Sequence, residues 1–108
     1  MNQLSVSLAK GSRHIALDTS TIGGYFDTVA KRFPESPALI SKHQHIYWNY
    51  QELKQQVDKL ATGLLAIGIN PGDRVGIWSP NCAEWYLTQL ATAKMGAILV
   101  CINPAYQT

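Results

Sequence analysis

The chain has 108 residues, of which 46% are apolar and 15% are charged, a composition that fits one globular domain or a piece of one and argues against disorder. Its net charge of +2 comes without a basic block, so electrostatic capture of nucleic acid is not expected. No stretch approaches the ~20 apolar residues that a membrane-spanning helix needs, and the N-terminus lacks the pattern of a signal peptide.

The chain begins with an arm and a helix. Residues 1–20 show no hydrophobic period, which predicts an extended arm. Apolar residues then recur at helical spacing and predict a helix over Thr21–Phe33, which Pro34 ends. Gly23 and Gly24 are expected to weaken the first turn of this helix, because glycine is a poor helix former.

Two short strands follow. Residues Ala38–Ser41 and Ile46–Trp48 are predicted strands, and the four residues between them predict a hairpin. His43 and His45 in this connection would serve either as a metal-binding pair or as polar turn residues. Without a third ligand nearby, the second interpretation is favoured.

The second helix, Tyr50–Ile67, has clear signals at both ends. Asn49 and Glu52 have the spacing of a capping box, in which each side chain binds the other residue's backbone N–H. Gly68 is predicted to end the helix in a left-handed conformation, with Ile69 as its apolar follower.

A strand–helix–strand unit completes the chain. Val75–Trp78 and Ile98–Ile102 are apolar strand candidates, and a helical pattern over Cys82–Met95 separates them. This order predicts two parallel neighbouring strands and an α/β fold. The helix has two candidate starts: a capping box of Asn81 with Glu84, or Ser79 followed by proline at the first helical position.

The apolar positions of these elements define a predicted core. The strand Ile98–Ile102 is apolar throughout, which is typical of a strand covered on both faces, and Cys101 is therefore expected to be a small core residue. Cys82 is interpreted as an ordinary residue at a helix start. With two cysteines and no disulfide framework, the chain suits a reducing cytoplasm. The residues predicted to be buried are Leu53, Leu60, Leu64, Val75, Ile77, Leu90, Ile98 and Val100.

Residues able to run a reaction are not evident. No GxGxxG follows the strand and no GxxxxGK[ST] occurs, while Gly68 and Gly72 precede the strand and serve a helix end and a turn. Asp73 with Arg74 is interpreted as a turn aspartate beside a surface arginine. Lys94 suits compensation of a helix dipole. We therefore assign no catalytic, cofactor-binding or metal-binding residue within the 108 residues.

Two segments of the chain are RFPESPALI and, after it, WNYQELKQQVDKLATGLLAIGINPGDRVGIWSPNCAEWYLTQLATAKMGAILVCINPAY. Together they resemble the start of the adenylate-forming ligases. Within that family they are most similar to the fatty-acyl-CoA synthetases. The resemblance runs from about Thr21 to the last residue. Each of its motifs is weak alone, but their order and spacing together are specific. They are the helix start (Trp48, Tyr50, Glu52, Leu53), the strand entrance (Gly72 to Val75), the turn (Pro80, Asn81, Glu84) and the final segment (Ala93, Gly96, Ala97, Asn103, Pro104).

The resemblance implies an enzyme that joins a carboxylic acid to AMP, using ATP and Mg²⁺, and passes the acyl group to coenzyme A. It implies that residues 21–108 are part of the large N-terminal α/β domain of such a fatty-acid ligase, with the remainder of the parent chain as partner. The phosphate loop, the aromatic-Thr-Glu motif, the ribose-binding aspartate and the C-terminal lysine of the family are absent from this segment. The 108 residues alone are therefore expected to be inactive.

Two other interpretations remain open from the residues. One is a stand-alone α/β module that binds a small ligand at the carboxyl ends of its strands. The other is an interaction domain whose exposed sheet edge pairs with a partner, and that partner could be a second copy of the chain.

Overall fold

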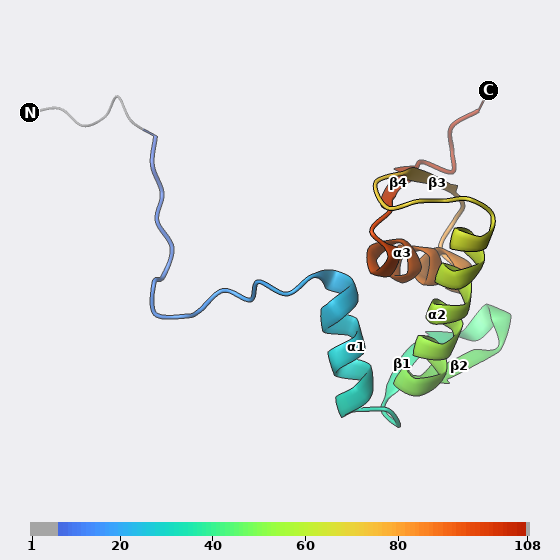
Figure 1. The fold of residues 1–108 in the computed structure, drawn as a ribbon, viewed down its shortest axis with the longest axis horizontal. Helices are drawn as coiled ribbons and strands as arrows, with labels where there is room; N and C mark the ends of the chain where they lie inside the picture. Colours follow the sequence, from blue (N-terminus) through green and yellow to red (C-terminus); the bar gives the residue numbers. More distant parts are fainter. Residues whose placement is uncertain (1–6, 108) are drawn as a thin grey trace, which may run out of the picture.

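The computed structural model describes residues 7–107, and its elements follow the predicted order with boundaries that differ by at most one residue (Figure 1). The α/β fold is thereby confirmed. The elements are α1 (Ile22–Arg32), β1 (Pro37–Ser41), a 3₁₀ turn (Lys42–Gln44), β2 (Ile46–Asn49), α2 (Tyr50–Ala66), β3 (Arg74–Trp78), α3 (Ala83–Met95) and β4 (Ile98–Ile102).

The strands form two separate two-stranded sheets. β1 and β2 are antiparallel, as a hairpin requires, with an irregularity between Pro37 and Leu39. β3 and β4 are parallel, from Arg74 opposite Ile98 to Trp78 opposite Ile102, which confirms the predicted strand–helix–strand unit. The two sheets lie at opposite ends of α2 (Figure 1).

The helix ends explain why α2 begins and stops where it does. Asn49 Oδ1 accepts from the Glu52 N–H at 2.8 Å and Glu52 Oε1 accepts from the Asn49 N–H at 3.1 Å, so the predicted capping box is formed. Gly68 has a φ of 100°, and the next residue donates its N–H to the Leu64 carbonyl at 3.0 Å. That pair of features is the predicted left-handed helix end.

The core lies where the three helices converge. Its buried members are Phe26, Leu53, Val57, Ala61, Leu90 and Ala91, and the hairpin covers one side of them with Ala38, Leu39 and Trp48. Of the predicted core, Leu53 and Leu90 are buried as expected. Leu60 and Leu64 are only partly buried at its margin, and Val75 and Ile77 are half-buried on β3.

The prediction that β4 is covered on both faces is wrong. Ile98 is 48% exposed and Val100 is 40% exposed, and Cys101, expected in the core, is exposed as well. The physical reason is that only one face of the β3–β4 sheet has a partner layer. Within residues 7–107, α3 packs on one face, while the other presents apolar side chains to solvent.

Gly23 has a different role from the one predicted. A Cβ atom at Gly23 would lie 2.7 Å from the Lys94 Cα and 3.1 Å from the Ala93 carbonyl oxygen. Glycine at this position therefore lets α1 cross α3 at close range. Ala91 of α3 is fully buried in the same helix cluster, so a small residue of α3 also serves this packing.

Candidate functional site

A hollow of about 570 Å³ lies at the carboxyl ends of β3 and β4, and we call it the strand-end hollow. Parallel pairing brings these two ends to the same edge of the sheet, which is where open α/β sheets hold ligands. Ser79 and Asn81 follow β3, Asn103 follows β4, and Trp85 of α3 contributes an indole. The remaining lining residues are Pro80, Cys101, Ile102 and Pro104.

The side chains of this hollow suit binding rather than proton transfer. Ser79 Oγ donates to the Pro80 carbonyl at 2.9 Å and lies 3.4 Å from the Cys82 Sγ, while Asn103 Oδ1 accepts from the Ala105 N–H at 2.9 Å. Its lining includes no carboxylate, lysine, arginine or histidine. Hydroxyl, amide and indole groups offer hydrogen bonds and stacking, the two kinds of contact that small-molecule pockets use.

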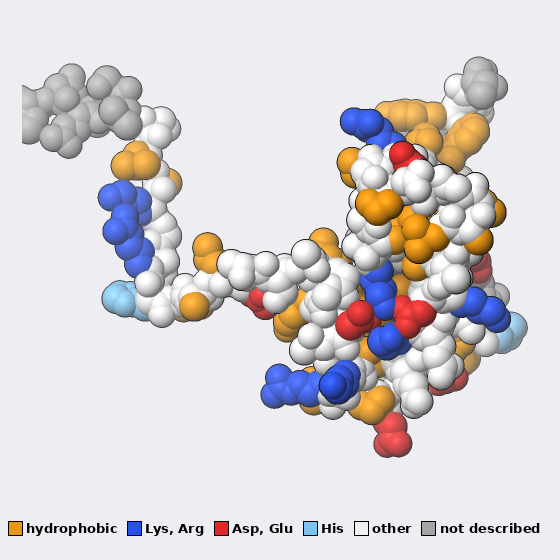
Figure 2. All heavy atoms as spheres, in the orientation of Figure 1, with side chains coloured by type: hydrophobic (Ala, Val, Ile, Leu, Met, Phe, Trp, Pro, Cys, Tyr) orange, Lys and Arg blue, Asp and Glu red, His pale blue; other side chains and the backbone are white. Residues whose placement is uncertain are grey.

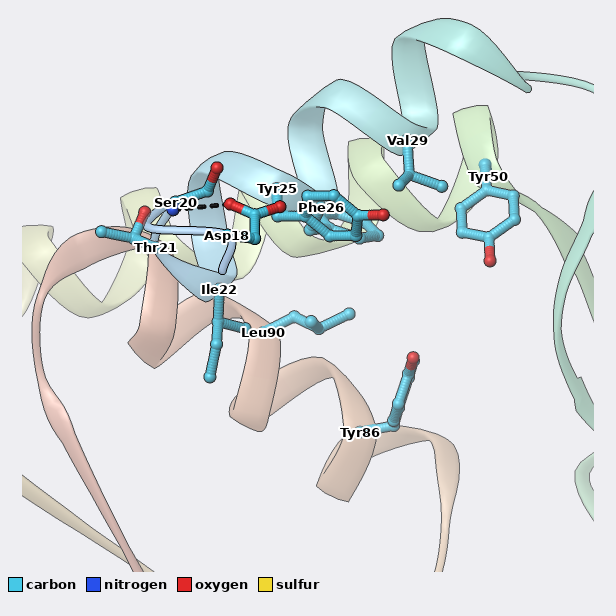
Figure 3. Close-up of a pocket in the computed structure, with 10 residues that line it drawn as sticks. All are labelled: Asp18, Ser20, Thr21, Ile22, Tyr25, Phe26, Val29, Tyr50, Tyr86 and Leu90. Atoms are coloured by element: carbon cyan, nitrogen blue, oxygen red, sulfur yellow. Dashed lines mark hydrogen bonds between the residues drawn. The ribbon is translucent and has the colours of Figure 1, made fainter. Parts of the chain in front are cut away.

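A second hollow, of about 580 Å³, runs between α1 and α3 and is mainly apolar (Figure 3). We call it the α1–α3 groove. Its aromatic walls come from Tyr25 and Phe26 of α1, Tyr50 of α2 and Tyr86 of α3. It also includes Asp18, Ser20, Thr21, Ile22, Val29 and Leu90. Asp18 is the one charged residue in this lining, and it belongs to the arm.

The start of α3 is held by a residue that sequence reasoning missed. Gln44 Oε1 accepts from the Ala83 N–H at 2.8 Å, and Gln44 Nε2 donates to both carboxylate oxygens of Glu84 at 2.9 and 3.1 Å. Both predicted starts are wrong: Cys82 occupies the N-cap position without a side-chain cap. A local capping pattern did not predict where this helix begins, because the residue that caps it lies in the hairpin turn, 39 residues away in the sequence.

Gln44→Ala is expected to lower the free energy of unfolding by about 1 kcal/mol, since loss of a helix cap typically has that cost. The measurement is urea unfolding followed by far-ultraviolet circular dichroism. His43→Ala, an exposed change in the same turn, is the control and should leave stability within ~0.5 kcal/mol. Equal effects of the two substitutions would contradict the capping role.

Charged side chains gather where α1, α2 and α3 meet (Figure 2). Lys94 Nζ lies 2.8 Å from Asp27 Oδ1 and also contacts Asp58 Oδ1, and Lys54 Nζ lies 2.6 Å from Asp58 Oδ2. The predicted dipole role of Lys94 is therefore only part of what this residue does. The residue does lie in the last turn of α3, but its side chain, only 16% exposed, joins α3 to α1 and α2.

The two groups at the centre of this cluster have shifted pKa values. Burial raises the pKa of Asp58, but hydrogen bonds from Lys54 and Lys94 act more strongly together, so its pKa lies below the ordinary 3.8. Burial lowers the pKa of Lys94, and its hydrogen bonds to Asp27 and Asp58 outweigh burial, so its pKa lies above 10.5. Both groups are therefore charged throughout the neutral range.

Lys94→Met is expected to lower the free energy of unfolding at pH 7 by ~1–2 kcal/mol, because it leaves two carboxylates with one remaining cation in a partly exposed setting. The contribution of Asp58, whose pKa is lowered, is present above its unfolded value and is lost as pH falls below 3.8. The contribution of Lys94 is present below 10.5 and is lost as pH rises beyond that. Chemical denaturation across pH should therefore show both declines in the native chain. In Lys94→Met the acid decline should be weaker and the alkaline contribution of Lys94 should be absent; unchanged declines would contradict the cluster's role.

The other polar residues considered in the sequence lie outside this charged cluster and do not come together in one site. His43 and His45 are exposed in the hairpin connection, where His45 has a left-handed φ of 56°. Asp73 Oδ2 accepts from the Asn70 N–H at 2.7 Å in a turn, as interpreted. Among residues 7–107, no three histidine, cysteine or acidic side chains come close enough to hold a metal ion. Over the same residues, no helix has the length and hydrophobicity to pass through a bilayer.

Comparison with known proteins decides the family. The AMP-binding enzyme family matches residues 26–108. The chain belongs to that family. Medium-chain acyl-CoA ligase ACSF2, mitochondrial, of Mus musculus is 48% identical over 103 residues, which are 95% of this chain and 17% of the relative. The chain thus spans about a sixth of the length of this relative.

Solved structures show the same fold. A fatty acyl CoA synthetase of Mycobacterium tuberculosis matches with a TM-score of 0.76 and 29% identity, over 80% of this chain and 17% of that one. The N-terminal subdomain of Klebsiella oxytoca NpsA matches with a TM-score of 0.75 and 32% identity, over 81% of this chain and 22% of that one. The predicted relationship to adenylate-forming enzymes, and the predicted α/β fold, are therefore confirmed.

Proposed function

We propose that this chain forms part of an ATP-dependent ligase that converts a fatty acid to acyl-AMP and then to acyl-CoA. The observation that carries the proposal is the family match over residues 26–108. The names of the mouse relative and of the mycobacterial synthetase favour a fatty acid as substrate. The rest of the parent ligase is the proposed partner of these residues.

The proposed ligase would use ATP, Mg²⁺ and coenzyme A, and residues 7–107 do not fit the first two. Mg²⁺ is held by oxygen ligands, and no cluster of three potential metal ligands exists here. Phosphate groups call for cations or backbone donors that converge on one site, and the hollow at the carboxyl ends of β3 and β4 is lined by no lysine or arginine. We therefore assign no step of the reaction to these residues, and propose that the chain alone forms no acyl-AMP.

The contribution we propose for these residues is structural. The helical core packs against the hairpin at one end of α2, and α3 packs on the parallel sheet at the other end. The strand-end hollow then faces outward, with Trp85 and Asn103 available to a ligand held mainly by other parts of the ligase. A cytoplasmic location stays a prediction, favoured by two free cysteines; the mouse relative is named as mitochondrial.

The test is to replace the matching segment of the mouse ligase with this sequence and to measure acyl-CoA formation from a medium-chain acid. We expect activity within about tenfold of the parent, a loss of at most ~1.4 kcal/mol in transition-state stabilisation. The control is the same chimera with Leu53→Asp, which places a charge in the core and should abolish folding. A folded, monodisperse chimera that makes no acyl-CoA would argue against the proposal.

One observation favours a second candidate, an interaction module that uses its sheet. β4 lies at the edge of a two-stranded sheet and exposes Ile98, Val100 and Ile102, and such an edge is a template for pairing with a second copy. Sedimentation velocity should then show concentration-dependent association that Val100→Lys suppresses. The control Gln89→Lys changes an exposed position on α3. A wild-type chain that remains monomeric at high concentration rules this candidate out.

A further inference from the structure

The arm and the α1–α3 groove have complementary surfaces. Residues 7–20 contain no helix or strand and are exposed throughout. Among them, Ile15 is 77% exposed and Leu17 is 90% exposed, although both side chains are strongly apolar. The groove in turn exposes apolar walls, with Ile22 at 69% and Tyr25 at 54%. Burial of these surfaces against one another would remove apolar area from water on both sides.

The arm is continuous in sequence with the residues that line the groove. Asp18, Ser20 and Thr21 line one end of the groove, so Leu17 is the residue immediately before its lining (Figure 3). The Ser20 N–H donates to Asp18 Oδ1 at 2.7 Å, so a local hydrogen bond lies between the arm and α1, and the assigned bends of the arm lie further along it, at residues 13–15. Residues 16–20 belong to no helix or strand, so no regular hydrogen-bonded element has to break when the arm is redirected at this point.

We propose that residues 14–17 fold back and lie as an extended strap along the α1–α3 groove of the same chain. The inference does not depend on the proposed ligase function. In an extended segment alternate side chains share a face, so Ile15 and Leu17 point together into the groove while Ala16 faces solvent. Leu17 then lies near Ile22 and Leu90, and Ile15 lies near Tyr86.

The dimensions agree with this arrangement. Four extended residues span roughly 13 Å. The part of α1 that lines the groove, from Ile22 to Val29, rises ~10 Å at 1.5 Å per residue. The strap therefore covers the groove from its arm end to the tyrosines at the far end.

Polar groups for the strap backbone are also present. The hydroxyls of Tyr50 and Tyr86 point toward one another into the open space of the groove (Figure 3). Buried backbone N–H and C=O groups need partners, and a tyrosine hydroxyl can donate and accept. These two residues meet the docked strap at its Ile15 end.

Paramagnetic relaxation tests the strap. A nitroxide is attached to Ala16→Cys in a chain that also carries Cys82→Ser and Cys101→Ser, and amide signals of Tyr50 and Tyr86 are followed by NMR. We expect the label to broaden both signals. Replacing Ile15 and Leu17 by serine in the labelled chain should restore them, whereas a label at Ser7→Cys should leave them sharp.

Three results would overturn the proposal. They are absence of broadening from position 16, broadening that survives the double serine replacement, and broadening that appears only between chains. The last is measured by mixing a spin-labelled, unenriched chain with an unlabelled, ¹⁵N-enriched chain, and it would show an arm that docks on a second copy. None of these substitutions alters a buried core residue.

Discussion

Leu53→Ala is expected to lower the free energy of unfolding by about 2–5 kcal/mol, the range for removing a large buried aliphatic side chain. Leu53 is 0% exposed and lies in the cluster formed by α1, α2 and α3. It is also the first residue after the capping box of α2. The measurement is reversible urea unfolding monitored by tryptophan fluorescence.

Leu65→Ala is the matched control for this prediction. Leu65 belongs to the same helix but is 50% exposed, so its truncation should change stability by less than ~0.5 kcal/mol. Leu64 is partly buried and should give an intermediate value. A cost below ~0.5 kcal/mol for Leu53→Ala would show that the three helices do not pack as described.

Gly23→Ala is expected to destabilise the chain by ~1–3 kcal/mol, the usual cost of forcing extra volume into a packed contact. The added methyl group would lie 2.7 Å from the Lys94 Cα, and neither this backbone atom nor the nearby Ala93 carbonyl can rotate away. α1 must therefore move from α3, which also disturbs the ion pair between Asp27 and Lys94. Thermal and urea unfolding should both report the loss.

Gly63→Ala provides a control of opposite sign. Gly63 lies within α2, and a Cβ atom there would meet no other atom within 4 Å. Alanine is a better helix former, so this change should stabilise the chain by ~0.5–1 kcal/mol. If Gly23→Ala were also neutral or stabilising, the close crossing of α1 and α3 would be refuted.

Local signals in the sequence were sufficient for the elements and for both ends of α2. The capping box of Asn49 with Glu52 and the left-handed end at Gly68 depend on neighbouring residues, and both are present as predicted. The parallel pairing of β3 with β4 follows from the order strand, helix, strand. The family was also recognisable, because its motifs keep their order along the chain.

Features that depend on distant residues were missed. The cap of α3 comes from Gln44, and the partners of Lys94 lie on two other helices, so no spacing rule could have found them. Gly23 was interpreted as a weak helix residue because its role appears only against α3. For β4, an apolar strand pattern does not tell which face has a partner layer. For the strand-end hollow, the sequence predicted only its position at the carboxyl ends of the parallel strands, and not its lining residues.

The proposal that these residues support a ligase without carrying its chemistry is tested most directly by an activity assay on the purified 108-residue chain. The chain is incubated with ATP, Mg²⁺ and a panel of fatty acids, and acyl-AMP and pyrophosphate are measured. We predict no product above that of Leu53→Asp prepared in parallel, since a contaminating ligase would be present in both preparations. Acyl-AMP that forms with the native chain, is absent with Leu53→Asp and scales with protein concentration would contradict the proposal.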